Sequence, residues 1–399
     1  MPSFNTLSII RLAFSLFLLN SSQWASVYSI STGLNYSETG ISLSLNALDF
    51  FVMVTVVWLT AFLVLYLKRD ELKTRGITVY PFFIMVRRDS RSEWFPSVTR
   101  TKAFKALEWA LLGLSFVSSG LGFWLLIEAI YNKYVTPAGP LEASITPIIP
   151  GITTPLDQAP YILLAIAVSV TLHELMHAMS STSNGIKVRG GGILLIYIFP
   201  GAFVEPDEQE FRKAEKAKRL KVIAAGIGVN FVLALLFLAL MNYAVPAMSQ
   251  GAQIVGLVKD YPAYNASIPV GSVILAVNGH KITVPSQVDS FLSKTEPNNV
   301  TLLVNGSLVT KTLFTPQGKL GVYLDYYFPS SIEQGLAYFI IWMYIINFSL
   351  ALINALPLFI TDGAKLFSEL LGPQGQKTVM YLSGGTLLLL LLALRLPGT

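Results

Sequence analysis

The sequence contains no cysteine among its 399 residues, and charged residues make up only 13% of it. A chain without cysteine cannot form disulfide bonds, thiolate metal sites or a cysteine nucleophile. Soluble domains carry about 25% charged residues, so this composition argues against a single water-soluble fold. The net charge of +5 is small for this length and gathers in a few loops, which indicates membrane orientation and not nucleic-acid binding.

Long apolar runs are abundant, and 53% of the residues are hydrophobic. Windows of about 20 apolar residues predict six membrane spans. They cover residues 49–67, 107–131, 160–181, 219–246, 335–357 and 378–395. Residues 7–27 are a weaker seventh candidate, which could be a span, an uncleaved signal anchor or an interfacial helix. We expect a span there, because a cleavable signal peptide would carry its basic residues before the apolar run, whereas Arg11 lies inside it.

Basic residues predict the orientation of these spans. The loop at 68–105 carries ten Lys and Arg residues, whereas the loop at 131–159 carries only Lys133. A second basic cluster at 212–221 falls on the same side of the membrane by alternation of the spans. Both basic segments are therefore expected in the cytoplasm, and the polar segment at 247–333 is expected outside.

The polar segment at 247–333 predicts a small, mainly β domain inserted between two groups of spans. Its short β-branched runs are separated by turn signals such as Asn278-Gly279 and Asn305-Gly306. The expected fold class is an α-helical polytopic membrane protein of about six to seven spans with a small, mainly β extracytoplasmic domain. We expect four parts: N-terminal spans with a basic cytoplasmic loop, two halves of a membrane core, and the β domain between these halves. They cover 1–131, 160–246, 334–399 and 247–333, respectively.

His173 and His177 are two of only three histidines in the chain, and they lie four residues apart within an apolar helix. This spacing points both imidazoles along one helical face, and Glu174 completes an H-E-x-x-H arrangement. Two neutral imidazoles in this arrangement bind Zn²⁺, and the glutamate takes a proton from the attacking water. An ionisable residue within a span costs about 2.5–3.5 kcal/mol and is normally retained for a function. The alternative is that both histidines are structural and bond to neighbouring helices.

A catalytic zinc ion needs a third protein ligand and one open position. Cysteine is absent and His280 lies in the outer domain, so a carboxylate must serve as that ligand. Asp362 is the best candidate, because the predicted topology brings it and His177 to the cytoplasmic ends of their helices. Pro357 and Gly363 would break the helix locally, which is tolerated at membrane depth only against protein or a water-filled cavity. Asp362 could instead be an ordinary helix N-cap.

Three ordered motifs on three spans resemble those of the site-2 protease family of intramembrane zinc metalloproteases. They match the family's H-E-x-x-H, G-x-x-x-N and N-x-x-P-x-x-x-x-D-G patterns and are, in order, His173-Glu174-Leu-Met-His177, Gly226-Ile-Gly-Val-Asn230, and Asn354-Ala-Leu-Pro357 leading to Asp362-Gly363. The resemblance covers about 160–395, and the stretch 199–208 is similar to that of the archaeal and eukaryotic members. Thr361 departs from the leucine that is common at this position, but it is not a proposed ligand.

The resemblance implies an intramembrane zinc endopeptidase that cleaves transmembrane segments of membrane proteins, as in regulated intramembrane proteolysis. It implies one zinc ion per chain, bound by His173, His177 and Asp362. Glu174 would act as the general base and then as the general acid. The implied partners are a transmembrane protein substrate and the lipid bilayer, without nucleic acid. The enzyme would be a multi-pass protein of the cell membrane with its active site towards the cytoplasmic side.

Two asparagines and two segments have roles that the sequence leaves open. Asn230 and Asn354 resemble buried asparagines of the family, which would hydrogen-bond the substrate backbone or the developing oxyanion. They could equally join neighbouring helices. The segment 189–200 is rich in strand formers and would either pair with an unwound substrate by strand addition or form a plain re-entrant hairpin. The apolar run at 77–86 is expected to dip into the membrane, without an assigned function.

The outer domain resembles a PDZ domain through residues 261–266 and 271–282, except that Ser272 stands where aspartate is usual. A PDZ-like groove would bind an extended peptide or a free C-terminal carboxylate, although the domain could also be a spacer. Three other functions compete with intramembrane proteolysis. A membrane zinc protease of another type would need a later Glu-x-x-x-Asp helix, which the sequence lacks. The others are a non-proteolytic receptor or scaffold, and a transporter with Glu174 and Asp362 as relay groups.

Overall fold

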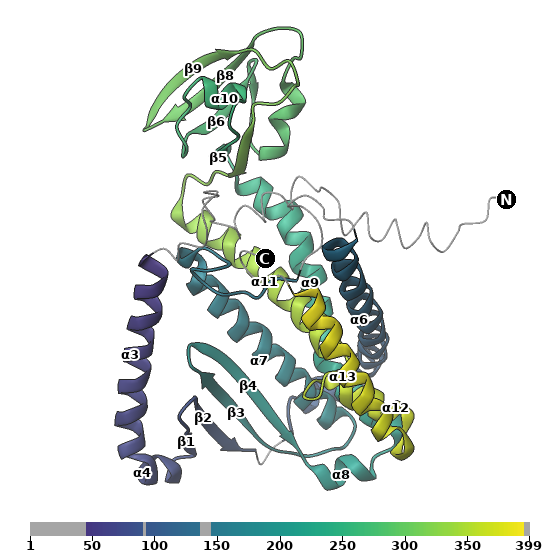
Figure 1. The fold of residues 1–399 in the computed structure, drawn as a ribbon. Coiled ribbons are helices and arrows are strands. Elements are labelled where there is room, and N and C mark those ends of the chain that lie inside the picture. Colours follow the sequence, from purple (N-terminus) through teal and green to yellow (C-terminus); the bar gives the residue numbers. More distant parts are fainter. Residues whose placement is uncertain (1–44, 91–92, 136–144, 395–399) are drawn as a thin grey trace, which may run out of the picture.

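The structure of the protein is a computed structural model, and it describes residues 45–90, 93–135 and 145–394 (Figure 1). The six long helices among these residues are α3 (Leu45–Leu67), α6 (Lys102–Tyr134), α7 (Ala159–Ser183), α9 (Lys216–Met248), α11 (Ser331–Ala355) and α13 (Gln376–Ala393). The shorter ones are α4 (Arg69–Thr74), α5 (Pro96–Thr99), α8 (Glu208–Lys213), α10 (Pro262–Asn265) and α12 (Asp362–Leu371). Single 3-10 turns lie at Leu156–Gln158, Pro285–Gln287, Asp289–Phe291 and Pro373–Gly375.

Six of the described helices are long and apolar enough to cross a membrane, which confirms the prediction of a polytopic membrane protein. Each candidate span overlaps one of the six apolar windows of the sequence. The spans are Asp49–Leu67, Lys102–Tyr134, Leu156–Ser183, Lys216–Met248, Ser331–Ala355 and Gln376–Ala393. The weaker seventh candidate, at 7–27, lies outside the described residues.

Helix α9 lies at the centre of the bundle and packs against α6, α7, α11 and α12 (Figure 1). Small residues allow this close approach, as is common between membrane helices. A Cβ atom at Gly228 would lie 2.6 Å from Cβ of Leu111 on α6, so only glycine fits between these two helices. Helix α3 instead stands apart from the other long helices, and nearly all of its span is exposed or half-buried. Its indole at Trp58 donates a hydrogen bond to the carbonyl of Pro81 at 3.2 Å.

A four-stranded antiparallel sheet lies beside α7 and joins segments that are far apart in the sequence. Its strands, in the order β1-β2-β3-β4, are β1 (Ile77–Val79), β2 (Phe83–Asp89), β3 (Val188–Ile196) and β4 (Phe199–Pro206). The run at 77–86, for which the sequence predicts no function, forms the β1–β2 hairpin and pairs with β3. The segment 189–200 likewise belongs to the β3–β4 hairpin.

Three successive glycines in β3 explain how this sheet is tied together. Arg87 on β2 reaches across β3 to Glu205 on β4, with Nη2 and Oε2 2.8 Å apart. A Cβ atom at Gly190 would lie 3.3 Å from this guanidinium and 3.5 Å from this carboxylate, so a side chain there would crowd the ion pair. At Gly192 a Cβ atom would meet the carbonyl oxygen of Val86. The glycine run therefore serves strand pairing and the ion pair across it.

Strand β4 ends the sheet beside the helix that carries both histidines. It pairs with β3 along one edge and packs against α7. Within the described residues, its second edge has no strand partner. An unpaired edge leaves backbone N–H and C=O groups available to another extended chain.

The segment between α9 and α11 forms a second, antiparallel sheet with its own apolar core. Strands β5 (Ala252–Leu257), β6 (Val273–Val277), β8 (Asn298–Val304), β9 (Ser307–Leu313) and β10 (Val322–Tyr326) lie in the order β10-β5-β6-β8-β9, and β7 (His280–Lys281) pairs with β6. The β-branched runs seen in the sequence lie within β5, β6 and β8. Asn278-Gly279 and Asn305-Gly306 both have positive φ at each residue, as two-residue hairpin turns require.

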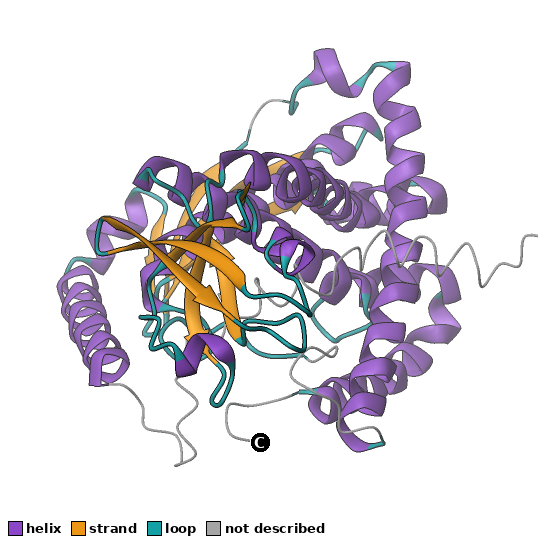
Figure 2. Ribbon diagram, turned by 90° about the horizontal axis from the view of Figure 1, so that it is seen from above, coloured by secondary structure: helices purple, strands orange, loops and turns teal. Residues whose placement is uncertain are grey.

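The two sheets lie towards opposite ends of the helix bundle. The β5–β10 domain stands at one end, while the β1–β4 sheet, α8 and α12 lie towards the other (Figure 1). Seen from above, the strands of the domain overlie the helices (Figure 2). The chain thus places its extended segments at both ends of a bundle of apolar helices.

Candidate active site

Both histidines lie on one face of α7, one helical turn apart. Residues 159–183 are continuously helical, so residues four apart stack along the axis. The ring centroids of His173 and His177 are 4.8 Å apart, and the side chains are 8% and 11% exposed. The expected pairing of the two imidazoles is therefore present within the protein interior.

Asp362 meets these two imidazoles from a helix that begins 185 residues later in the chain. Its Oδ2 atom lies 3.1 Å from Nε2 of His173 and 3.0 Å from Nε2 of His177. The two Nε2 atoms are 3.1 Å apart. Three candidate ligand atoms from α7 and α12 thus converge on one point.

Asp362 is not the N-cap of α12, so that alternative reading of the sequence is wrong. The N-cap is Thr361, whose hydroxyl accepts a hydrogen bond from the amide of Ala364 and donates one to the carbonyl of Leu356 at 2.6 Å. Asp362 is the first helical residue, and its carboxylate is free to point at the histidines. Gly363 lets α12 begin directly against the end of α11, because a Cβ atom there would lie 2.4 Å from the carbonyl oxygen of Leu356.

The spacing of the three ligand atoms fits a tetrahedral zinc ion. Bonds of about 2.0–2.1 Å to a tetrahedral zinc ion separate neighbouring ligand atoms by about 3.3–3.4 Å. The observed separations of 3.0–3.1 Å come within a few tenths of an ångström of this value. Two imidazoles and one carboxylate are also a donor set that zinc accepts, with one position left for water. The residues present therefore fit the ion that the sequence predicts.

The outward-facing nitrogens of both imidazoles have partners that orient the rings. Nδ1 of His177 lies 2.7 Å from the carbonyl oxygen of Val222, which can only accept, so Nδ1 carries the proton and Nε2 is left unprotonated. Nδ2 of Asn230 lies 3.0 Å from Nδ1 of His173, and Oδ1 of Asn230 has no hydrogen-bond partner among the described residues. Turning the amide over exchanges these two atoms, so that Oδ1 accepts the proton of Nδ1 and leaves Nε2 of His173 unprotonated.

Gly226 on α9 leaves the space that both imidazoles occupy. A Cβ atom built at this position would lie 2.4 Å from Nε2 of His177 and 2.6 Å from Nε2 of His173. No real side chain tolerates such contacts, so the cradle around the ligand nitrogens exists only because residue 226 lacks a side chain. The G-x-x-x-N motif therefore contributes to the site through both its ends, Gly226 and Asn230.

A buried carboxylate holds the end of α7 that follows the histidines. Glu108 on α6 is 1% exposed, and its oxygens accept hydrogen bonds from the hydroxyl of Ser180 at 2.6 Å, the amide of Asn184 at 2.6 Å and the hydroxyl of Ser183 at 3.0 Å. Charge-assisted bonds of this kind are about twice as strong as neutral ones. They fix the last turn of α7 against α6, one turn beyond His177.

Glu174 lines a pocket of about 230 Å³ next to the cluster, together with His177 and Asp362. Lys365 lies on the same pocket, and its Nζ atom is 2.9 Å from Oδ1 of Asp362, the oxygen that faces away from the histidines. The sequence did not single out Lys365, although its place one helical turn after Asp362 is the spacing of an i,i+3 ion pair.

Asn354, the second asparagine that the sequence singled out, lies half-buried in the last turn of α11. Among the described residues, no hydrogen bond joins it to the His–Asp cluster. A different buried asparagine, Asn347, donates to the hydroxyl of Ser169 on α7 at 2.8 Å and so joins α7 to α11. The structure therefore brings Asn230, but not Asn354, into contact with a candidate ligand.

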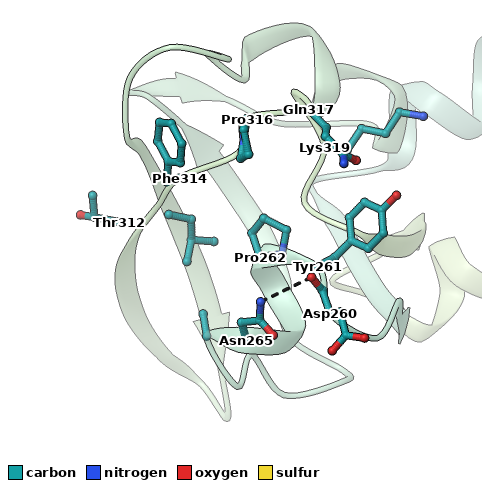
Figure 3. Close-up of a pocket in the computed structure, with 11 residues that line it drawn as sticks. Asp260, Tyr261, Pro262, Asn265, Thr312, Phe314, Pro316, Gln317 and Lys319 are labelled. Atoms are coloured by element: carbon teal, nitrogen blue, oxygen red, sulfur yellow. Dashed lines mark hydrogen bonds between the residues drawn. The ribbon is translucent and has the colours of Figure 1, made fainter.

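A larger hollow of about 550 Å³ lies in the β5–β10 domain, away from this chemistry (Figure 3). Helix α10 with Tyr261 and Pro262 forms one side, and the segment with Phe314 and Pro316 forms another. None of the predicted catalytic or metal-binding residues lines it. The smaller pocket at the histidines is the one that carries a reactive arrangement.

Comparison with known proteins agrees with this geometry. The model of the peptidase family M50 matches residues 161–392, which is more than half of the chain and contains all three candidate ligands. An uncharacterised protein of Methanocaldococcus jannaschii is 29% identical over 270 residues, which cover 63% of this chain and 69% of that protein.

Two further relatives carry names that describe a function. The Arabidopsis thaliana homologue of the membrane-bound transcription factor site-2 protease is 26% identical over 215 residues, which cover 50% of this chain and 41% of that protein. A Clostridium perfringens protein that carries the name zinc metalloprotease is 30% identical over 193 residues, which cover 41% of this chain and 56% of that protein. The chain thus matches only about half the length of these two relatives.

Proposed function

Because the chain belongs to peptidase family M50 and is a zinc metalloprotease of the membrane, we propose that it hydrolyses peptide bonds within transmembrane segments of other membrane proteins. The single observation that carries this proposal is the convergence of His173, His177 and Asp362 inside the helix bundle. Both histidines lie on α7, one of the helices that are long and apolar enough to cross a membrane. Regulated intramembrane proteolysis is the process that such an enzyme serves.

The zinc ligands in this proposal are Nε2 of His173, Nε2 of His177 and Oδ2 of Asp362. When bound, zinc supplies a Lewis acid and lowers the pKa of a water ligand to about 7. The ring orientations support these assignments, because Val222 and Asn230 engage the opposite nitrogens of the two imidazoles. Gly226 keeps the space at the ligand nitrogens open.

Glu174 is the proposed general base and general acid. Its carboxylate lines the same pocket as His177 and Asp362, so it can accept a proton from the attacking water and deliver it to the leaving amine. Asn230 acts on His173 in this proposal, and the amide atom that does not face the imidazole remains for the substrate. Asn354 is kept as a candidate for binding the substrate backbone.

Strand β4 is the proposed binding edge for the substrate. A transmembrane helix hides its peptide bonds in its own hydrogen bonds, so a segment must unwind before water can attack it. An unwound segment could pair with the free edge of β4, which lies beside α7 and ends at the pocket through Val204 and Pro206. The alternative is that the β3–β4 hairpin only shields the site from lipid.

The proposed orientation puts the β1–β4 end of the bundle in the cytoplasm and the β5–β10 domain outside. The basic loops at 68–105 and 212–221 support this orientation, because positively charged segments remain on the cytoplasmic side. The order and hairpin turns of the β5–β10 sheet are consistent with a PDZ-like domain, which would bind an extended peptide or a free carboxylate from a substrate trimmed outside.

Reconstitution with a single-span substrate tests this proposal. The purified protein is placed in liposomes with a transmembrane helix that contains helix-breaking residues, and the products are mapped by mass spectrometry. We expect a cut within the span that Glu174→Gln and a zinc chelator both abolish, and that added zinc restores only in the chelated wild type. Wild-type protein with one zinc ion per chain and no cut in any substrate would instead favour a scaffold or receptor.

A further inference from the structure

The pocket beside the histidines is lined by both polar and apolar side chains. Glu174, His177 and Asp362 are the polar residues at which the chemistry is proposed. Val204, Phe211 and Ile223 are apolar lining residues, and the wall they form is called the apolar end here. The two charged side chains that also line the pocket already have partners, since Lys365 pairs with Asp362 and Glu208 pairs with Arg212.

The apolar end arises from the alternation of side chains along β4. Val204 and Pro206 are two residues apart and line the pocket together, whereas Glu205 points to the other face and pairs with Arg87. Helix α8 closes this end with Phe211, which packs against a buried cluster containing Ile223. Asp207 fixes the start of α8, because its carboxylate accepts hydrogen bonds from the backbone amides of Gln209 and Glu210. The wall is therefore built by elements that the fold holds in place.

We infer that this apolar end is a subsite for one large apolar side chain, of the leucine or phenylalanine class, from the substrate residue directly next to the cleaved bond. The inference rests on the proposed function and adds a substrate preference to it. The pocket is continuous from Glu174 to Phe211, so a residue held at the catalytic end has its side chain or its neighbour's side chain at the apolar end.

The size of the pocket sets the kind of occupant. Sites for whole small molecules measure about 300–1,000 Å³, whereas a cavity of about 150 Å³ takes one benzene molecule. A pocket of about 230 Å³ therefore suits a single side chain. A charged side chain would gain no free partner among the lining residues of the apolar end, because Glu208 and Lys365 are already paired.

This subsite is tested with a set of single-span substrates. The substrates differ only at the two residues that flank the mapped cleavage site. Each flanking residue is Leu, Phe, Ala, Trp or Asp in turn, and kcat/KM is measured in liposomes. At one flanking position we expect the wild type to favour Leu and Phe over Ala by about tenfold or more. Val204→Trp fills the subsite and should reverse this preference towards Ala, and Phe211→Ala enlarges it and should raise kcat/KM for Trp.

Phe203→Trp is the matched control, because Phe203 neighbours Val204 on β4, faces the opposite side of the sheet and does not line the pocket. It should keep the wild-type preference. If both Val204→Trp and Phe211→Ala retain zinc and keep the wild-type preference, the subsite proposal is overturned. Cleavage by the wild type would still uphold the proposed function in that case. If Val204→Trp loses its zinc or cleaves nothing, the profile of Phe211→Ala decides alone. A zinc-loaded wild type that cleaves no member of the set overturns both proposals.

Discussion

Gly226 gives the sharpest structural prediction, because alanine there would put a methyl carbon inside the zinc site. The added Cβ atom would lie 2.4 Å from Nε2 of His177 and 2.6 Å from Nε2 of His173. Ordinary van der Waals contact begins at 3.4 Å, so at least one imidazole must move by about 1 Å. Zinc–ligand distances tolerate about ±0.2 Å. A displacement several times larger should remove a ligand from the ion.

The expected result for Gly226→Ala is a zinc affinity lowered by more than about 100-fold, beyond the 10–100-fold loss typical for changes to outer partners of metal ligands. Zinc affinity is measured by competition with a chelator, and zinc content by mass spectrometry of the purified protein. Proteolysis should fall in parallel with bound zinc. Saturating zinc should restore little activity, because the displaced imidazole cannot return.

Two other glycine-to-alanine changes separate loss of the site from loss of the fold. Gly113 on α6 has no atom within 4 Å of its added Cβ, so Gly113→Ala should leave zinc binding unchanged. Gly228→Ala should weaken α6–α9 packing and lower the melting temperature, because its Cβ would lie 2.6–2.7 Å from Leu111. If Gly226→Ala keeps one tightly bound zinc ion per chain and cleaves at the wild-type rate, the assigned geometry of the site is wrong.

Three further changes test the surroundings of the site and the β domain. Lys365→Met should lower zinc affinity by about 10–100-fold, because it leaves Oδ1 of Asp362 without a cationic partner. Lys365→Arg keeps a cation there and should lower zinc affinity much less. Equal zinc affinities of the two variants in a chelator competition would contradict this role of Lys365. Glu108→Ala should lower the melting temperature in detergent far more than Glu108→Gln, since each buried donor left without an acceptor costs about 1–3 kcal/mol. Burial raises the pKa of Asp325 from 3.8 to about 7. The free energy of unfolding should therefore fall by up to about 4 kcal/mol as the pH rises from about 4 to about 7. Asp325→Asn should therefore match the wild type below about pH 4 and melt at a higher temperature than the wild type at pH 8, and identical pH profiles of melting temperature would exclude the shift.

Local patterns in the sequence predicted the parts of the fold that depend on composition and period. Apolar windows located all six described spans, because a bilayer requires long apolar helices whatever they pack against. The spacing of His173 and His177 predicted a shared helical face, since helix periodicity alone determines it. Asn278-Gly279 and Asn305-Gly306 likewise identified hairpin turns through the positive φ angles that these residues adopt.

Features that depend on contacts between distant segments could not be read in this way. The pairing of β2 with β3 joins residues about a hundred positions apart, and the apolar run at 77–86 carries no local signal of its partner. Gly226 was recognised only as part of the G-x-x-x-N motif, because its contact with both imidazoles follows from the packing of α9 against α7. The capping role of Thr361 could not be read locally either, because threonine and the neighbouring aspartate are both favoured N-caps.

X-ray absorption at the zinc edge tests the central claim, the His173–His177–Asp362 zinc site, most directly. The purified wild type should bind one zinc ion per chain with two imidazole nitrogens and carboxylate or water oxygens at about 2.0–2.2 Å. Glu174→Gln should give the same zinc-edge spectrum without proteolysis, whereas Asp362→Ala should lose most of its zinc. Full zinc content and an unchanged spectrum in Asp362→Ala would contradict the assigned site.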